Sequence, residues 1–356
     1  MMDDTTTMLR DAVSRLLKDH VTAHRTMELE RAGIDAALWT RFAEMGLRGD
    51  GTGLGLDARM AVLQETGRAG ALLPYAESEV LGRLLAEGAG LELGDATLTV
   101  MPGDVRAETL AGGGARLYLP GAPIPWGRHA SHVLVRCVVG GQACVAAIEG
   151  PSLEWQAQAN MAGEPRDGVL AASVVVPSSA LHPLRELLDA DWLQRTGALC
   201  RAASMVGALG TALELAIQYA QDRKQFGKPL SQFQVIQSYL AEMAAETCAA
   251  AVALDLATAG AVSGDGWGDV AVAKVRAGQA ANTVARLAHQ VHGAIGMTRE
   301  YPLNVWTRRL WSWREEFGNE SYWSGVLGRS VIDEGEGAFW PRMAGSTLPL
   351  ATEQRA

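Results

Sequence analysis

The second half of the chain is a succession of long helical runs with short connections, and this most constrains the fold. Apolar residues recur at helical spacing over about 186–225, 231–262, 269–292, 299–314 and 319–334. Long helices joined by short turns bury their apolar faces mainly against one another, so this half predicts an antiparallel bundle over residues 184–340. A chain of 356 residues has room for two or three domains.

The first half divides into a helical part and a β-rich part. Helical patterns cover most of 4–48, 58–69 and 77–87, and the pattern changes near residue 95. Short β-type runs separated by glycines and prolines follow at 97–100, 115–119, 132–135, 143–148 and 172–176. We therefore expect an α+β protein. Its parts are an N-terminal α-helical domain (1–94), a small antiparallel β-domain of five to seven strands (95–183), the bundle, and a tail (341–356).

Composition narrows the classes of function. The net charge of −9 argues against a nucleic-acid partner held by bulk electrostatics. The chain has no run of about 18 uninterrupted apolar residues, so we expect no membrane span. The acidic start, Met1–Asp4, does not have the order of a signal peptide, and the four cysteines show no C-x-x-C spacing. We therefore expect a cytoplasmic protein with reduced thiols and no metal site.

The segment 223–237 has the pattern of a helix stop, a tight turn and a helix start. Gly227 suits a left-handed C-terminal cap, while Ser231 and Gln234 have the S-x-x-Q spacing of a capping box. Arg223 would then stand near a helix N-terminus, where the N–H groups and the guanidinium favour an anion such as a pyrophosphate. The alternative is an ordinary helical hairpin whose arginine caps carbonyl groups.

A second segment, Gln290–Leu303, ends another helix in glycines and restarts one at Pro302. Together the two segments resemble the acyl-CoA dehydrogenase family. In that family an R-x-x-F-G pattern and a later Q-x-x-G-x-x-G pattern followed by E-Y-P line the FAD site. The resemblance covers about 185–335 well and the N-terminal half only loosely. It implies the family fold of N-terminal helical domain, middle β-domain and C-terminal four-helix bundle.

The resemblance also implies FAD-binding roles for residues of both segments. In the family these groups reach the FAD of the neighbouring subunit, so at least a dimer is implied. Residue types alone leave other interpretations open: the phenylalanine as a core residue, the glycines as plain helix caps, the histidine as a hydrogen-bonded helix end. The matching positions are Arg223, Phe226, Gln234, Gln290, His292, Gly293 and Gly296.

The catalytic carboxylate of the family has no clear counterpart. Counted from the Glu300–Pro302 motif, the usual glutamate slot falls on Phe317, and the slot used by a minority of members falls near Gly197. Neither residue is an acid. Glu316 lies one residue from the first slot and is therefore the candidate base, although it could equally be a solvated charge near a helix end.

The resemblance implies α,β-dehydrogenation of an acyl-CoA thioester, with an acceptor similar to electron-transfer flavoprotein. The missing glutamates and a reduced β-domain loop at 99–104 resemble short subunits that pair with a different, longer subunit. Both a homo-oligomer and a heterotetramer remain open. The alternative function is a non-catalytic partner or scaffold subunit that completes the FAD site of another chain.

Overall fold

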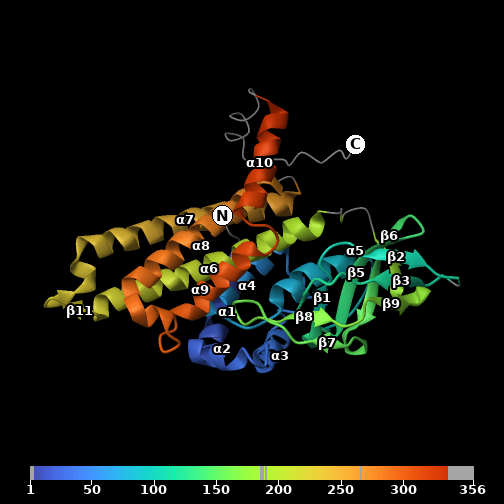
Figure 1. Cartoon of the computed structure of the whole chain (residues 1–356), viewed down its shortest axis with the longest axis horizontal. Helices are drawn as coiled ribbons and strands as arrows, with labels where there is room; N and C mark the ends of the chain where they lie inside the picture. Colours follow the sequence, from blue (N-terminus) through green and yellow to red (C-terminus); the bar gives the residue numbers. More distant parts are fainter. Residues whose placement is uncertain (1–3, 112, 185–187, 189–190, 265–266, 336–356) are drawn as a thin grey trace. The chain divides into compact units, whose positions relative to one another are not determined.

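A computed structural model describes residues 4–111, 113–184, 188, 191–264 and 267–335 (Figure 1). The predicted tail, 341–356, lies outside these residues. Two compact units cut across the sequence. Unit 1 comprises the residues up to 27, residues 55–71 and the residues from 197 onward, whereas unit 2 comprises 28–54 and 72–196. The linear division into domains at 94 and 183 stays a prediction.

Unit 1 contains the predicted helical bundle, and each of the five long runs holds one helix. Two N-terminal helices also belong to unit 1: α1 (Asp4–His20) packs on α4 (Leu56–Ala69). Helix α2 (Ala23–Leu29) follows α1. The long helices are α6 (Trp192–Asp222), α7 (Gln234–Ser263), α8 (Trp267–His292), α9 (Leu303–Glu315) and α10 (Glu320–Glu334).

Helices α4 and α6 cross at a pair of glycines. A Cβ on Gly67 of α4 would overlap the backbone of Ser204, and a Cβ on Gly207 of α6 would overlap the backbone of Gln64. The two helices therefore approach to backbone contact, which only glycine permits. Fully buried alanines along α6, such as Ala208, continue this tight packing.

Two helices, α6 and α7, are long and apolar enough to cross a membrane by length and composition alone. The most apolar stretch of α6 is 56% buried, but that of α7 is only 28% buried. Helix α6 therefore behaves as a core helix of the bundle, whereas α7 leaves much of its apolar surface uncovered.

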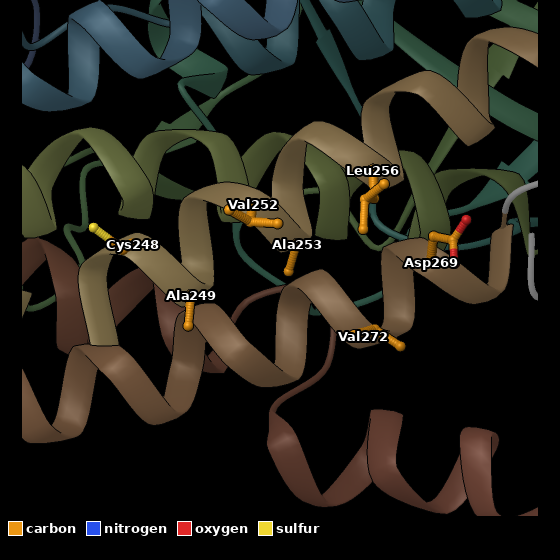
Figure 2. A pocket seen from close by; sticks show the side chains of 7 residues that line it. All are labelled: Cys248, Ala249, Val252, Ala253, Leu256, Asp269 and Val272. Atoms are coloured by element: carbon orange, nitrogen blue, oxygen red, sulfur yellow. The ribbon is translucent and has the colours of Figure 1, made fainter. Parts of the chain in front are cut away.

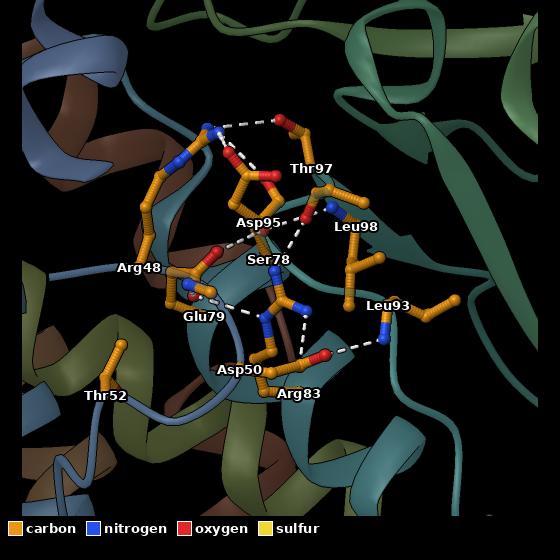
Figure 3. Close-up of polar contacts among 12 residues, drawn as sticks. Arg48, Asp50, Thr52, Ser78, Glu79, Arg83, Leu93, Asp95, Thr97 and Leu98 are labelled. Carbon is orange, nitrogen blue, oxygen red and sulfur yellow. Dashed lines mark hydrogen bonds and ion pairs between the residues drawn. The ribbon is translucent and has the colours of Figure 1, made fainter. Parts of the chain in front are cut away.

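The helical part of unit 2 is held by a buried ionic network (Figure 3). This helical part comprises α3 (Ala36–Glu44), a π-helix η1 (Ala76–Gly82) and α5 (Arg83–Gly88). The Arg83 side chain, 1% exposed, pairs with Glu79 (3.3 Å) and Asp50 (2.9 Å). Asp50 in turn accepts from the backbone N–H of Leu93 (2.6 Å). The network ties three segments together and satisfies charges that would be costly to bury alone.

The β-part of unit 2 is richer in strands than predicted. Three sheets have the orders β1-β5-β6-β10, β2-β3-β9 and β4-β8-β7. Strand β1 runs parallel to β5, so the expectation of five to seven strands, all antiparallel, is wrong in both respects. The described strands here are β1 (Leu98–Val100), β2 (Arg106–Thr109), β3 (Ala115–Tyr118), β4 (Ile124–Pro125), β5 (His132–Val139), β6 (Gln142–Glu149), β7 (Trp155–Gln156), β8 (Arg166–Val169), β9 (Ser173–Val176) and β10 (Leu181–Pro183).

The five predicted β-type runs each contain a strand, and the longest two form the centre of the main sheet. Strands β5 and β6 pair antiparallel from His132 opposite Glu149 to Val139 opposite Gln142. The turn between them is Gly140-Gly141, both with positive φ, as a two-residue hairpin requires. Inward residues of these strands, such as Val133 and Val135, lie in the hydrophobic core of the β-part.

Candidate functional site

The segment after α6 is a β-hairpin and not the predicted helix cap. Helix α6 ends at Asp222, and β11 (Lys224–Gln225) then pairs with β12 (Lys228–Pro229). Phe226 (φ 51°) and Gly227 (φ 81°) form the tip, the combination that a two-residue type I′ turn demands. The expectation that Gly227 caps the helix is therefore wrong, because the backbone leaves the helix earlier and pairs with itself.

The predicted capping box at the start of α7 is also wrong. A 3-10 turn, η5 (Leu230–Gln232), includes Ser231, and α7 begins at Gln234 after Phe233 with no side-chain cap. The carbonyl of Ser231 instead accepts from the side chain of Gln237 (2.9 Å). The first N–H groups of α7 thus lack a side-chain cap, which leaves them available to a ligand.

The hairpin presents a cation and an aromatic ring to solvent. Phe226 is 92% exposed and meets Phe233 edge-on at 6.3 Å. The Lys228 ammonium lies 4.3 Å from the centre of the Phe233 ring. The exposed Arg223 donates to the side-chain oxygen of Gln225 (3.0 Å) and has no ion-pair partner within the described ranges. A phenylalanine held in a left-handed conformation and fully in water is unfavourable unless something covers it.

The second predicted segment forms a sharp turn on a packed aromatic base. Helix α8 ends at His292, and a 3-10 turn η6 (Gly293–Met297) follows, with Gly293 at φ 64°. The His292 ring, 3% exposed, stacks on Tyr219 of α6 at 4.5 Å and meets Tyr301 at 4.6 Å. Its Nδ1 lies 2.7 Å from the carbonyl of Ala288, and burial lowers its pKa, so the ring is a neutral support for the turn at pH 7.

The two segments come together at one end of the bundle. The end of α6, the start of α7 and the end of α8 all lie there (Figure 1), and the Tyr219–His292 stack links them. Gln234 and Gln290 are exposed at this end, while Gly296 is buried and a Cβ there would lie 2.8 Å from the Cβ of His292. The structure therefore assembles all seven predicted FAD-binding positions at this end.

These residues fit an extended, anionic, ring-bearing cofactor such as FAD. The unpaired guanidinium and uncapped helix N–H groups suit a phosphate, and the exposed Phe226 offers an apolar contact. Nothing lies within 4 Å of a Cβ on Gly293, so the turn is open on its outer side. The ring Nδ1 of His289, buried beside Gly296, has no hydrogen-bond partner within the described part of the chain.

The two glutamate slots of the family meet in space. A Cβ on Gly197 of α6 would lie 2.5 Å from Cγ and Cε1 of Phe317, which sits in the turn between α9 and α10. Phe317 has φ 53°, and its carbonyl accepts from Trp323 Nε1 (2.9 Å). The phenylalanine ring therefore fills the volume that a side chain at position 197 would need, and neither slot carries an acid.

Glu316 is turned into an ion pair. Its carboxylate accepts from Nε of Arg201 on α6 (2.6 Å), and the exposed fractions of the Arg201 and Glu316 side chains are 5% and 20%. The Arg201 guanidinium also lies 5.6 Å from the centre of the Phe317 ring. The ion pair with Arg201 restricts the approach of the Glu316 carboxylate to a substrate.

A buried lysine, missed in the sequence, holds this turn from the other side. Lys274 of α8 is 1% exposed and donates from Nζ to the carbonyls of Arg314 and Gly318, both at 2.7 Å. Burial lowers its pKa to about 8, against the opposing charges of Glu320 and Glu316. The only sequence signal is a single lysine in the apolar run that opens α8, at a position expected to face the core.

The predicted FAD-binding positions and the candidate base, Glu316, lie near opposite ends of α6. Arg201, the partner of Glu316, lies in the first part of α6, and Arg223 directly follows its last residue. At a rise of 1.5 Å per residue, the two arginines are about 33 Å apart along the helix axis. The structure thus brings the FAD-type positions together with one another but keeps Glu316 apart from them.

Known proteins are similar to this chain over its C-terminal half or, at lower identity, over most of its length. A model of the acyl-CoA dehydrogenase C-terminal domain matches residues 194–331. Acyl-CoA dehydrogenase IpdE2 of Mycolicibacterium smegmatis is 27% identical over 326 residues, which are 86% of this chain and 93% of that protein. A 3-sulfinopropanoyl-CoA desulfinase of Paraburkholderia xenovorans is 38% identical over 122 residues, so the match spans only about a third of its length (31%).

A solved structure of the ChsE4-ChsE5 complex from Mycobacterium tuberculosis shares the fold, with a TM-score of 0.83 and 24% identity. The match covers 95% of this chain and 99% of that one. These findings support an acyl-CoA dehydrogenase family member. Enzymes of that family act on CH–CH donors and typically depend on FAD. The predicted fold class is thereby confirmed.

Proposed function

We propose that this chain is an FAD-dependent acyl-CoA dehydrogenase that works as one subunit of a heteromeric enzyme. The observation that carries the proposal is the contrast between its two functional regions. In the region of the predicted FAD-binding positions, Arg223 has no ion pair among the described residues, Phe226 is exposed and Gly293 is open. The base region is closed by Phe317 against Gly197, and its nearest acid is paired with Arg201.

Arg223, Gln234 and the Gln290–Gly296 turn would hold the phosphates and adenosine part of FAD, and Phe226 would cover it. The bound flavin would supply the hydride acceptor for dehydrogenation. The chain's own contribution is binding and orientation: hydrogen-bond donors, a packed aromatic base and an uncapped helix start. Since Arg201, which pairs with Glu316, lies about 33 Å from Arg223 along α6, this region would serve a flavin whose reacting ring lies against another subunit.

Removal of the α-proton then falls to a carboxylate of the partner subunit. An acyl-CoA thioester is the substrate class, and an electron-transfer-flavoprotein-like protein is the acceptor. We place the enzyme in the cytoplasm. The alternative is a non-catalytic partner or scaffold subunit that completes the FAD site of another chain.

The test is flavin retention in the complete assembly. Arg223→Ala, co-expressed with the partner subunit, should lose a charge-assisted contact of roughly 1.5–3 kcal/mol, or about ten- to a hundredfold in FAD affinity. Lys224→Ala, an exposed cation one residue further on, is the matched control and should retain FAD. Equal retention by both variants would refute the assignment, and equal loss would show that only bulk charge matters.

A further inference from the structure

Two of the four cysteines face each other across the central hairpin of the β-part. Strands β5 and β6 place Cys137 directly opposite Cys144. Residues opposite each other in an antiparallel pair project to the same face of the sheet, and both cysteines belong to the hydrophobic core on that face. The exposed fractions of Cys137 and Cys144 are 0% and 6%, and both are free thiols. The hairpin thus holds two thiols in register.

The hydrogen bonds of the sheet identify the kind of pair that the two cysteines form. The carbonyl of Arg136 accepts from the N–H of Val105, and the carbonyl of Ala143 accepts from the N–H of Leu184, both at 2.9 Å. Both carbonyls therefore point away from the other strand of the hairpin. The two cysteines, each one residue further on, form a hydrogen-bonded pair, whose α-carbons are about 5.5 Å apart. This separation lies within the roughly 4.4–6.8 Å that a disulfide spans.

We propose that Cys137 and Cys144 are a site of reversible oxidation, at which a peroxide converts the two thiols to a disulfide within the hairpin. The Cys144 thiolate attacks one oxygen of hydrogen peroxide, the O–O bond breaks, and a sulfenic acid and one water form. The sulfur of Cys137 then attacks the Cys144 sulfur, and the hydroxyl group leaves as a second water. Both sulfurs are oxidised, both peroxide oxygens are reduced, and the two thiol protons end in water.

The composition of the site favours a disulfide over a bound metal ion. Within the described part of the chain, no cluster of three or more histidine, cysteine, aspartate or glutamate side chains could hold a metal. Two sulfurs alone do not complete the four-ligand shell of a structural zinc site. A disulfide needs no further ligand and no additional volume, which suits a closely packed core.

The two thiols are reduced at rest, and Cys144 is the one that reacts first. Burial raises the pKa of both thiols, that of Cys137 to about 11, and the neighbouring Cys144 raises it further. The Cys144 thiol donates to the carbonyl of Gln142 (3.6 Å). Because the thiolate is the reactive form, we expect slow oxidation that begins at Cys144, which keeps some exposure. Cys144 also lies close to the hairpin turn at Gly140-Gly141, where local opening is easiest.

The geometry of the pair makes the disulfide readily reducible. The β-carbons of directly opposite residues in a hydrogen-bonded pair are about 5.5 Å apart, whereas those of a disulfide are roughly 3.5–4.5 Å apart. Closing the bond therefore draws the two strands together by about 1 Å or more. A strained disulfide is reduced more easily than a relaxed one, and disulfides of this kind in the cytosol are usually transient and redox-sensing. The inference does not depend on flavin or on catalysis.

Mass spectrometry of one peptide tests the proposal on the full chain. The variant Cys248→Ser is used throughout, because Cys248 is exposed and lines an open apolar hollow between α7 and α8 (Figure 2), where it would react by itself. No lysine or arginine lies between Arg136 and Arg166, so trypsin leaves both cysteines in the peptide 137–166. After native treatment with hydrogen peroxide, this peptide should be lighter by two hydrogens and resist iodoacetamide. Dithiothreitol should restore both thiols.

Substitutions test the order of the two steps and the register. Cys137→Ala should accumulate a sulfenic acid at Cys144, trapped with dimedone, whereas Cys144→Ala should give at least about tenfold less at the fully buried Cys137. Cys137→Val with Val138→Cys is the matched control. It moves the cysteine by one residue, to a 51% exposed position on the other face of the strand, and should form no disulfide. Circular dichroism checks that each variant folds.

Several results would overturn the proposal. One is a native chain that keeps both thiols after a day in peroxide, or forms the disulfide only when unfolded in urea. Another is oxidation of Cys144 to a product that dithiothreitol does not reverse. A disulfide that forms as readily in the shifted control would show that closeness in sequence, and not the register of the hairpin, brings the sulfurs together. Equal dimedone trapping at the two cysteines would refute the assignment of Cys144 as the first to react.

Discussion

The interlock of Gly197 and Phe317 makes a quantitative prediction about stability. Gly197 lies inside α6, where alanine in place of glycine ordinarily stabilises by roughly 0.5–1 kcal/mol. Here the added Cβ would lie 2.5 Å from two atoms of the Phe317 ring, and overpacking of this kind costs about 1–3 kcal/mol. We therefore expect Gly197→Ala to destabilise the protein by about 1–2 kcal/mol.

Removing the ring should reverse the sign of this effect. Phe317→Gly tolerates the left-handed backbone, and in that background Gly197→Ala should stabilise by roughly 0.5–1 kcal/mol. The double-mutant cycle should therefore give a coupling of about 1–3 kcal/mol. Gly210→Ala is the matched control on the same helix, because the nearest atom to its added Cβ, Arg68 Nη1, is 3.9 Å away.

The free energies of unfolding come from urea titrations followed by circular dichroism, compared at a common slope. Gly210→Ala should stabilise with or without Phe317. If Gly197→Ala also stabilises while Phe317 is present, the two slots do not share one volume, and the closure of the base region is refuted.

Two further predictions concern the same turn. Glu316→Gln should keep the turnover of the heteromer within about tenfold of the wild-type value, because a carboxylate of the partner takes the proton. A loss above about a thousandfold with FAD still bound corresponds to over ~4 kcal/mol of transition-state stabilisation and would make Glu316 the base. Burial lowers the pKa of Lys274 from 10.5 to about 8. Between about pH 8 and pH 10.5 the unfolded chain therefore binds a proton that the folded chain does not, and the free energy of unfolding should rise with pH over this range. Relative to Lys274→Met, the wild type should gain up to about 3 kcal/mol between about pH 7 and pH 10.5, measured by urea unfolding; a pH-independent difference would contradict a buried ammonium.

The sequence predicted the parts of the fold that a single segment determines. Each long helical run produced a helix within a few residues, because its apolar period alone decides which face is buried. The polar strand β2 (Arg106–Thr109) was missed because it is mostly exposed and carries no alternating apolar signal. It is a strand because β3 pairs with it, and such pairing comes from tertiary structure.

The hairpin after α6 was mispredicted for a local reason. The spacing of Ser231 and Gln234 fits a capping box, and a phenylalanine is a rare choice for the left-handed position that Phe226 occupies. The backbone pairing of Lys224 with Pro229 decided the conformation, and no periodic pattern encodes it.

The site residues divide in the same way. The FAD-type positions could be named from the sequence because the family pattern fixes them, and the structure brings them together at one helix end. The meeting of Gly197 with Phe317, 120 residues further along the chain, could not be seen without the packing of the α9–α10 turn on α6. Lys274 was invisible because a lysine is ordinarily expected at the surface.

The division of the chain between two units has a consequence for synthesis. Helices α1 and α4 are made early, but Trp306, whose indole donates to the carbonyl of Arg68 at 2.9 Å, emerges 238 residues later. At about 5–20 residues per second, the ribosome needs roughly ten to fifty seconds to deliver that partner. Until α6 and α9 have been synthesised, the face of α4 around Gly67 stays uncovered. A chaperone that binds nascent chains could bind this exposed helix face during that time.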